Sequence, residues 1–145
     1  MKKKMKHKTI MLTILVLCLV CIVPPLQVEA QPRRLAAEER EVLLEIGLQL
    51  GKKGWNLDVD PCNDTTWSTA PSGDEPLYNN TVVCNCSYPD GLCHVVKIFL
   101  KGQDLAGELP SSIAKLPYLT AIDFMRNYLT GNIPSAWAST KLEYL

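Results

Sequence analysis

The chain of 145 residues contains little histidine and has no excess of positive charge. It has two histidines, and its 15 basic and 15 acidic side chains cancel. Five lysines lie within the first eight residues, so the part from Gln31 onward holds ten basic and fourteen acidic side chains, a net charge of −4. Because this part has no basic stripe, we expect no nucleic-acid partner.

The chain also lacks an apolar run long enough to cross a membrane. Its longest run, Ile10–Val23, has about 14 residues, whereas a spanning helix needs about 20. Lysines precede the run, and small side chains follow it at Val28 and Ala30, which is typical of a secretory signal. We predict a signal peptide over 1–30, with an uncleaved anchor as the alternative, and a mature chain that begins near Gln31 without a membrane anchor.

Four cysteines lie beyond the signal peptide. An even number of cysteines in an oxidising compartment indicates two disulfides. A four-thiolate zinc site is the alternative, which the closely spaced Cys84 and Cys86 and the secretory context disfavour. Of the three possible pairings we predict the one that closes a short local loop and ties the N-terminal helical segment to the first strand. The predicted bonds are Cys62–Cys84 and Cys86–Cys93, with no metal or cofactor.

An amphipathic helix is predicted over residues 35–50, ending at Gly51. A loop-rich segment, 54–80, follows the helix, and its Trp55 and Trp67 are expected to pack on the helix and the first repeat. The apolar positions of the helix are Val42, Leu43, Ile46 and Leu50, and the acidic positions, expected to face solvent, are Glu38, Glu39, Glu41 and Glu45.

Three Asn-x-Ser/Thr motifs lie within 25 residues of this secreted segment. Each has a residue other than proline in the middle, so each is a candidate glycan acceptor. A disulfide at Cys86 could hide the third. The acceptors are Asn63, Asn79 and Asn85.

The segment from Val95 onward repeats itself with a period of 24 residues, and Leu142 and Leu145 begin a third copy at an offset of 23. A fixed period in the twenties with this apolar spacing indicates leucine-rich repeats. The matched pairs are Val95 and Leu119, Ile98 and Ile122, Leu100 and Phe124, Gln103 and Asn127, Leu105 and Leu129, Gly107 and Gly131, Leu109 and Ile133, Pro110 and Pro134, and Ile113 and Trp137.

Residue types within the repeat follow from its geometry. Asn127 is expected to turn inward, where its side-chain amide satisfies backbone groups of neighbouring turns. Gln103 occupies the equivalent position in the first repeat, so the first rung of that hydrogen-bond ladder is in question. Gly131 permits a tight turn, and Pro134 keeps the chain extended.

The Gly-x-Leu/Ile-Pro element of both copies resembles the plant-specific class of leucine-rich repeats. The segment before them, with Trp55, Asp60-Pro61-Cys62, Trp67 and Cys84, resembles the N-terminal cap of plant leucine-rich-repeat receptor kinases. A closer similarity, to receptor-like serine/threonine kinases with a malectin domain, covers about Glu38 to the end. It rests on Cys84-Asn85-Cys86-Ser87, Cys93-His94-Val95, Arg126-Asn127-Tyr128-Leu129 and Trp137-Ala138.

This resemblance implies an α/β solenoid: a helical, disulfide-bearing cap over 31–94, then two repeats and part of a third over 95–145. It implies an extracellular recognition module, in the apoplast or outside the plasma membrane, whose partner is a protein, a peptide, a cell-wall ligand or a co-receptor. The chain has no Gly-rich phosphate loop, H-R-D or D-F-G, so kinase activity and membrane attachment would belong to a part missing from a truncated product or gene model. A free-standing secreted binder or inhibitor is the alternative.

The candidate binding surface is the concave side of the repeat strands, where residues between the inward leucines are exposed. Phe99 and Met125 are apolar residues expected there, which favours a contact surface; alternatively, these first repeats only cap the solenoid. No enzyme is expected, since His7 lies in the signal and adjacent Cys93 and His94 would point to opposite faces of a strand. The candidate residues are Lys97, Phe99, Lys101, Ala121, Asp123, Met125 and Arg126.

Overall fold

The computed structural model describes residues 33–68 and 77–145. The predicted signal peptide, 1–30, lies outside the described residues, as does part of the predicted loop, 69–76. Among the described residues, no helix is both long enough and apolar enough to span a bilayer. The elements in chain order are α2 (Ala37–Leu50), η1 (Thr65–Trp67), β1 (Thr81–Asn85), β2 (His94–Phe99), η2 (Ser111–Lys115), β3 (Ala121–Asp123) and η3 (Ser135–Ser139).

Helix α2 buries one apolar stripe and ends as the sequence predicts. Leu43, Ile46 and Leu50 have no exposed surface, and Gly51 ends the helix in the left-handed conformation with φ of 68°. The helix begins two residues later than predicted. The expected solvent-facing position of Glu39 is wrong: Glu39 is only 4% exposed, because its carboxylate turns inward to bind strand β2.

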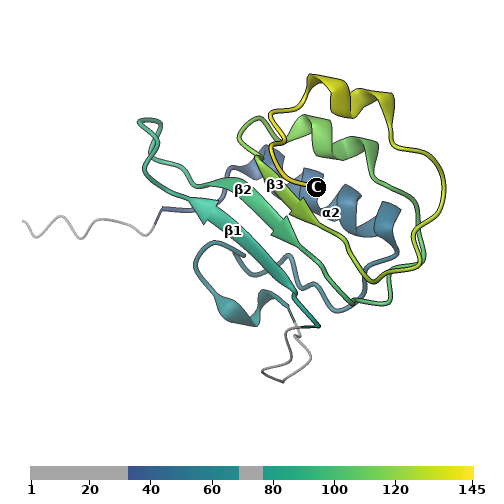
Figure 1. Ribbon diagram of the computed structural model, residues 1–145. Coiled ribbons are helices and arrows are strands. Elements are labelled where there is room, and N and C mark those ends of the chain that lie inside the picture. The colour runs from purple at the N-terminus through teal and green to yellow at the C-terminus, as the bar shows by residue number, and fades with distance from the viewer. Residues whose placement is uncertain (1–32, 69–76) are drawn as a thin grey trace, which may run out of the picture. The chain divides into compact units, whose positions relative to one another are not determined.

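The three strands form one sheet in the order β1-β2-β3, with β1 antiparallel to β2 and β3 parallel to it. Figure 1 shows the sheet on one side and α2, η2 and η3 on the other. Val82, Ile98 and Ile122 lie side by side in this register and are all buried in the core facing the helices. The repeats therefore share one core with the helix.

The 24-residue period predicted from the sequence is the register of the parallel pair β2–β3. Lys97 lies opposite Ala121, and Ile98 lies opposite Ile122. Asn127 joins the two turns: its Oδ1 accepts from the amides of Gln103 and Leu105 at 2.9 and 3.1 Å, and its Nδ2 donates to the carbonyl of Leu100 at 2.7 Å. The predicted inward asparagine is confirmed.

Gln103 does not repeat this role in the first turn. Its Nε2 donates to the carbonyl of Lys101, two residues away, at 3.3 Å, and its Oε1 accepts from Lys52 Nζ at 3.2 Å. The longer side chain therefore bonds within its own turn and to the end of the helical segment, and the ladder begins at Asn127.

The C-terminal turn of α2 takes the place of a preceding repeat. The amides of Gly107 and Glu108 donate to the carbonyls of Leu50 and Gln49 at 3.2 and 2.9 Å. A Cβ atom on Gly107 would lie 2.0 Å from the Gln49 carbonyl oxygen, so only glycine allows this approach. One step along, the Thr130 amide donates to the Gly107 carbonyl in the same manner. The helix end thereby gains partners for carbonyls that would otherwise lack them.

Two disulfides and a tryptophan pair close the segment between helix and repeats. Cys62 is bonded to Cys84, and Cys86 to Cys93, which is the predicted pairing. These bonds use all four thiolates that the zinc interpretation required. The loop closed by Cys62–Cys84 spans 22 residues, a constraint worth about 3.4 kcal/mol in the chain-entropy account. Trp55 and Trp67 pack together with ring centroids 5.2 Å apart.

Candidate recognition surface

The predicted binding residues lie on and just beyond strands β2 and β3, and those on β2 are on the sheet face that points away from α2. Lys97 and Phe99 flank the buried Ile98, so strand alternation turns them to the opposite side. Pairing then sets Phe99 beside Asp123 of β3. Beyond the strand ends, the Gly102 amide donates to the Met125 carbonyl at 3.0 Å, which keeps the two loops together.

One predicted member of this surface is not available to a partner. Ala121 is 5% exposed, because its strand is flanked on both sides: Lys97 pairs with it from β2, and Tyr144 forms a bridge from the other side. The expectation that Ala121 is exposed is therefore wrong. Of the two apolar candidates, Met125 is 62% exposed, while Phe99 is half-buried.

The remaining six residues, which we call the outer sheet face, concentrate positive charge. Lys97 and Arg126 are exposed, Lys101 is half-buried, and within the described ranges no ion pair involves any of the three. The one acid among them, Asp123, accepts from the Met125 amide at 2.9 Å. Elsewhere the described residues hold seven basic and eleven acidic side chains. The outer sheet face comprises Lys97, Phe99, Lys101, Asp123, Met125 and Arg126.

Two of the candidate glycan acceptors lie at the ends of β1, an outer strand of the sheet. Asn79 is half-buried just before the strand and accepts from Thr81 Oγ1 at 2.6 Å. Asn85 ends the strand and is exposed; its Oδ1 accepts from both the amide and the hydroxyl of Ser87. The disulfide at Cys86 therefore does not hide Asn85. Glycans at both ends would protect this edge from pairing with another chain.

We expect the chain, expressed with its predicted signal peptide, to carry glycans on Asn63 and Asn79, and on the exposed Asn85 as a third. Expression in a plant secretory pathway followed by glycosidase digestion should lower the mass in at least two steps. Replacing one acceptor at a time with glutamine should remove one step each, which assigns the sites. A mass unchanged by the enzyme would overturn both the glycans and the secretion.

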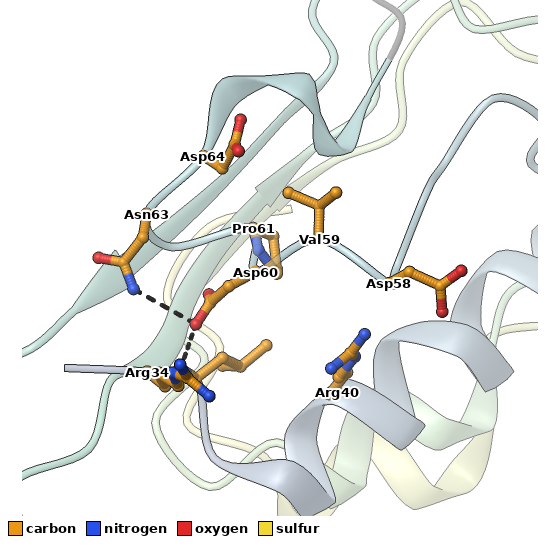
Figure 2. Close-up of a pocket in the computed structure, with 9 residues that line it drawn as sticks. Arg34, Arg40, Asp58, Val59, Asp60, Pro61, Asn63 and Asp64 are labelled. Carbon is orange, nitrogen blue, oxygen red and sulfur yellow. Dashed lines mark hydrogen bonds between the residues drawn. The ribbon is translucent and has the colours of Figure 1, made fainter. Parts of the chain in front are cut away.

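A pocket of about 360 Å³ lies beside the start of α2. Figure 2 shows its Asp60 carboxylate, which accepts from the Leu35 amide at 3.0 Å and from Asn63 Nδ2 at 3.3 Å. The other oxygen of Asp60 accepts from the Cys62 amide at 2.8 Å. The Asp-Pro-Cys motif thus joins the chain before α2 to the disulfide, and a glycan on Asn63 would stand at the pocket. We assign no ligand to it.

The sequence did not indicate a buried polar cluster around His94. The His94 side chain is 8% exposed, with Nδ1 2.6 Å from Glu39 Oε1 and Nε2 2.7 Å from Asp90 Oδ2. Glu39 stands 55 residues before His94, and an acid in the first turn of a helix is explained by the helix dipole alone. Cys93 is oxidised and His94 lies between two carboxylates, so the pair is not a nucleophile and its base.

No protein-family model matches the chain. Two probable leucine-rich-repeat receptor-like serine/threonine-protein kinases of Arabidopsis thaliana are similar to it: one is 39% identical over 74% of the chain, the other 41% identical over 77%. The chain spans about a tenth of their length, 11% in each case.

A solved structure has the same fold. The leucine-rich-repeat ectodomain of the receptor kinase SOBIR1 from Arabidopsis thaliana superposes with a TM-score of 0.59, at 19% identity. The match covers 78% of this chain and 54% of that one. The fold and repeat register therefore define the class, a leucine-rich-repeat ectodomain fold with disulfides. Within that class, the chain is homologous to the leucine-rich-repeat region of plant receptor-like serine/threonine kinases.

Proposed function

We propose that this chain is an extracellular recognition module and that its partner binds the outer sheet face through negative charge. The observation that carries the proposal is the charge distribution: three cations, for which the described residues supply no ion pair, lie on and just beyond β2 and β3, while the other described residues are mostly acidic. Such a face raises the local concentration of anionic partners and speeds their association. Among the expected partners, this favours an acidic protein or peptide.

Apolar side chains between the cations support a polypeptide partner. Met125 is largely exposed and Phe99 half-exposed, between Lys97 at one end and Arg126 at the other. Met is adaptable and recurs at surfaces that bind varied peptides. An extended acidic peptide can place carboxylates on the cations and apolar side chains on Met125 and Phe99.

We further propose that the module belongs to a receptor of the malectin-containing type, located outside the plasma membrane, with its membrane helix and kinase in a missing C-terminal part. The homologues are consistent with such a location. The proposed division is a signal peptide over 1–30, a cap over 31–94 and repeats from 95. A transcript that continues into a membrane helix and kinase would support this, whereas one that ends here would favour the secreted binder.

The test of recognition uses arrayed peptides that differ in acidic and apolar content. We expect the secreted chain to prefer peptides rich in Asp and Glu with interspersed apolar residues, and to bind less at high salt. A double variant with Lys97→Glu and Arg126→Glu should bind these peptides with a Kd about tenfold higher or more. Lys53→Glu, an exposed lysine beyond the end of α2, is the control and should change little. Equal binding by both variants would contradict the proposal.

A further inference from the structure

The cluster around His94 joins parts of the chain that are far apart in sequence. Glu39 comes from the first turns of α2, His94 begins β2, and Asp90 belongs to the loop 87–92 between the bonded Cys86 and Cys93. The contacts therefore hold this loop, helix α2 and strand β2 together.

Both carboxylates act as acceptors, so the ring must supply two donors. Glu39 Oε2 accepts from the Val95 amide at 2.7 Å, and Asp90 Oδ1 accepts from the Leu92 amide at 3.0 Å. The ring nitrogens meet the remaining oxygens, Glu39 Oε1 and Asp90 Oδ2. A neutral imidazole has one N–H and can donate to only one of the two, whereas an imidazolium donates to both. The geometry is that of the protonated ring.

The other groups around the ring are aromatic, with one cation beyond them. Tyr88 of the loop meets the ring edge-on with centroids 4.9 Å apart, and Tyr118, before β3, lies at 4.4 Å. Lys141 Nζ is 5.7 Å from the centre of the Tyr118 ring, on the way to the third copy of the repeat. Among the described residues, the charged groups that face the imidazole are thus Glu39 from α2 and Asp90 from the loop.

We propose that Glu39, His94 and Asp90 form a pH-responsive latch, which fastens the loop 87–92 when His94 is protonated and releases it when the proton leaves. On deprotonation the proton on Nε2 passes to solvent, and Nδ1–H stays with buried Glu39. The Asp90 carboxylate then faces the lone pair on Nε2, so the hydrogen bond between them is lost. Its side chain is 43% exposed, so it can turn to water at little cost, and Tyr88 leaves the ring with it. The disulfide confines the movement to the loop.

The direction of the pH dependence follows from the two pKa values. Burial by itself lowers the pKa of His94, but the hydrogen bonds and charges of Glu39 and Asp90 outweigh burial and raise it above its ordinary value of 6.5. The stabilisation of the loop 87–92 by protonated His94 is therefore complete below about pH 6.5, and it is lost as the pH rises through the raised pKa of His94. The hydrogen bond from the Leu92 amide, and after it the one from His94, lower the pKa of Asp90 below 3.8. Asp90 therefore becomes protonated, and its bond to His94 weakens, only in stronger acid.

The test follows the loop and the ring together by NMR in the isotope-labelled secreted chain. His94 is the one histidine beyond the predicted signal peptide, so its ring signals titrate unambiguously. We expect a pKa above 6.5 and, through the same titration, a fall of at least about tenfold in the exchange protection of the Gly91 and Leu92 amides, corrected for the intrinsic base-catalysed rate. A ring pKa at or below 6.5, or loop protection equal on both sides of the titration, would overturn the latch.

A matched pair of variants separates the latch from ordinary structural support. In Asp90→Asn the amide can accept from a protonated ring or donate to a neutral one, so the pKa of His94 should fall and loop protection should lose its pH dependence. Asp104→Asn removes an exposed carboxylate elsewhere and should leave both unchanged. A loop in Asp90→Asn that still opens with pH as in the parent chain would also contradict the proposal.

Discussion

Asn127→Ala is expected to lower the free energy of unfolding by about 3 kcal/mol, because it leaves several backbone groups between the repeats without a partner. The side chain accepts from two amides of the preceding turn, Gln103 and Leu105, and donates to the carbonyls of Leu100 and Phe124. Alanine replaces none of these bonds. Denaturant unfolding of the secreted chain, followed by circular dichroism, measures the loss.

Gln103→Ala is the matched control at the equivalent position one repeat earlier. Gln103 bonds within its own turn and to Lys52 rather than across repeats, so its removal should cost less than about 1 kcal/mol. Equal losses from the two variants would show that the ladder does not begin at Asn127.

Gly107→Ala is expected to destabilise the chain by about 3 kcal/mol by forcing α2 and the first repeat apart. The new Cβ would lie 2.0 Å from the Gln49 carbonyl oxygen and 2.6 Å from the Leu50 carbonyl carbon. Both are backbone atoms, so no side chain can move aside to relieve the clash. Thermal unfolding should show a lower Tm, and the amides of Gly107 and Glu108 should lose exchange protection.

Gly47→Ala in the same helix is the control for Gly107→Ala. There the added Cβ meets a Trp55 ring carbon at 3.2 Å, a side-chain contact that can shift by a few tenths of an ångström. Alanine also favours a helix over glycine by roughly 1 kcal/mol. We expect a change close to zero. A Gly107→Ala variant as stable as the parent would mean that the helix end does not pack on the repeat in this way.

The outer sheet face and the glycan acceptors lie on different strands, whereas the acceptor Asn85 pairs with His94 of the latch. Cations lie on β2 and just beyond β2 and β3, whereas Asn79 and Asn85 flank β1. A glycosylated β1 edge leaves the β2–β3 side open to a partner. The latch adds a loop whose position would depend on pH at the start of β2.

Periodic features of this protein could be predicted from the sequence alone. The 24-residue offset is the register between Ile98 and Ile122, because parallel strands of successive repeats stack with equivalent residues side by side. The spacing of Leu43, Ile46 and Leu50 predicts the buried stripe of α2, since residues three and four apart share a face of a helix. Local loop closure indicated which cysteines pair.

Contacts between residues far apart in sequence were decided only by the tertiary structure. The helical spacing places Glu39 on the solvent side of the helix, but the fold brings β2 against the first turns of α2. The buried carboxylate there binds His94 and the Val95 amide. Ala121 was expected to be exposed from its place in the strand, but pairing on both sides covers it. A sequence pattern records which face a residue occupies, whereas burial depends on what the fold places over that face.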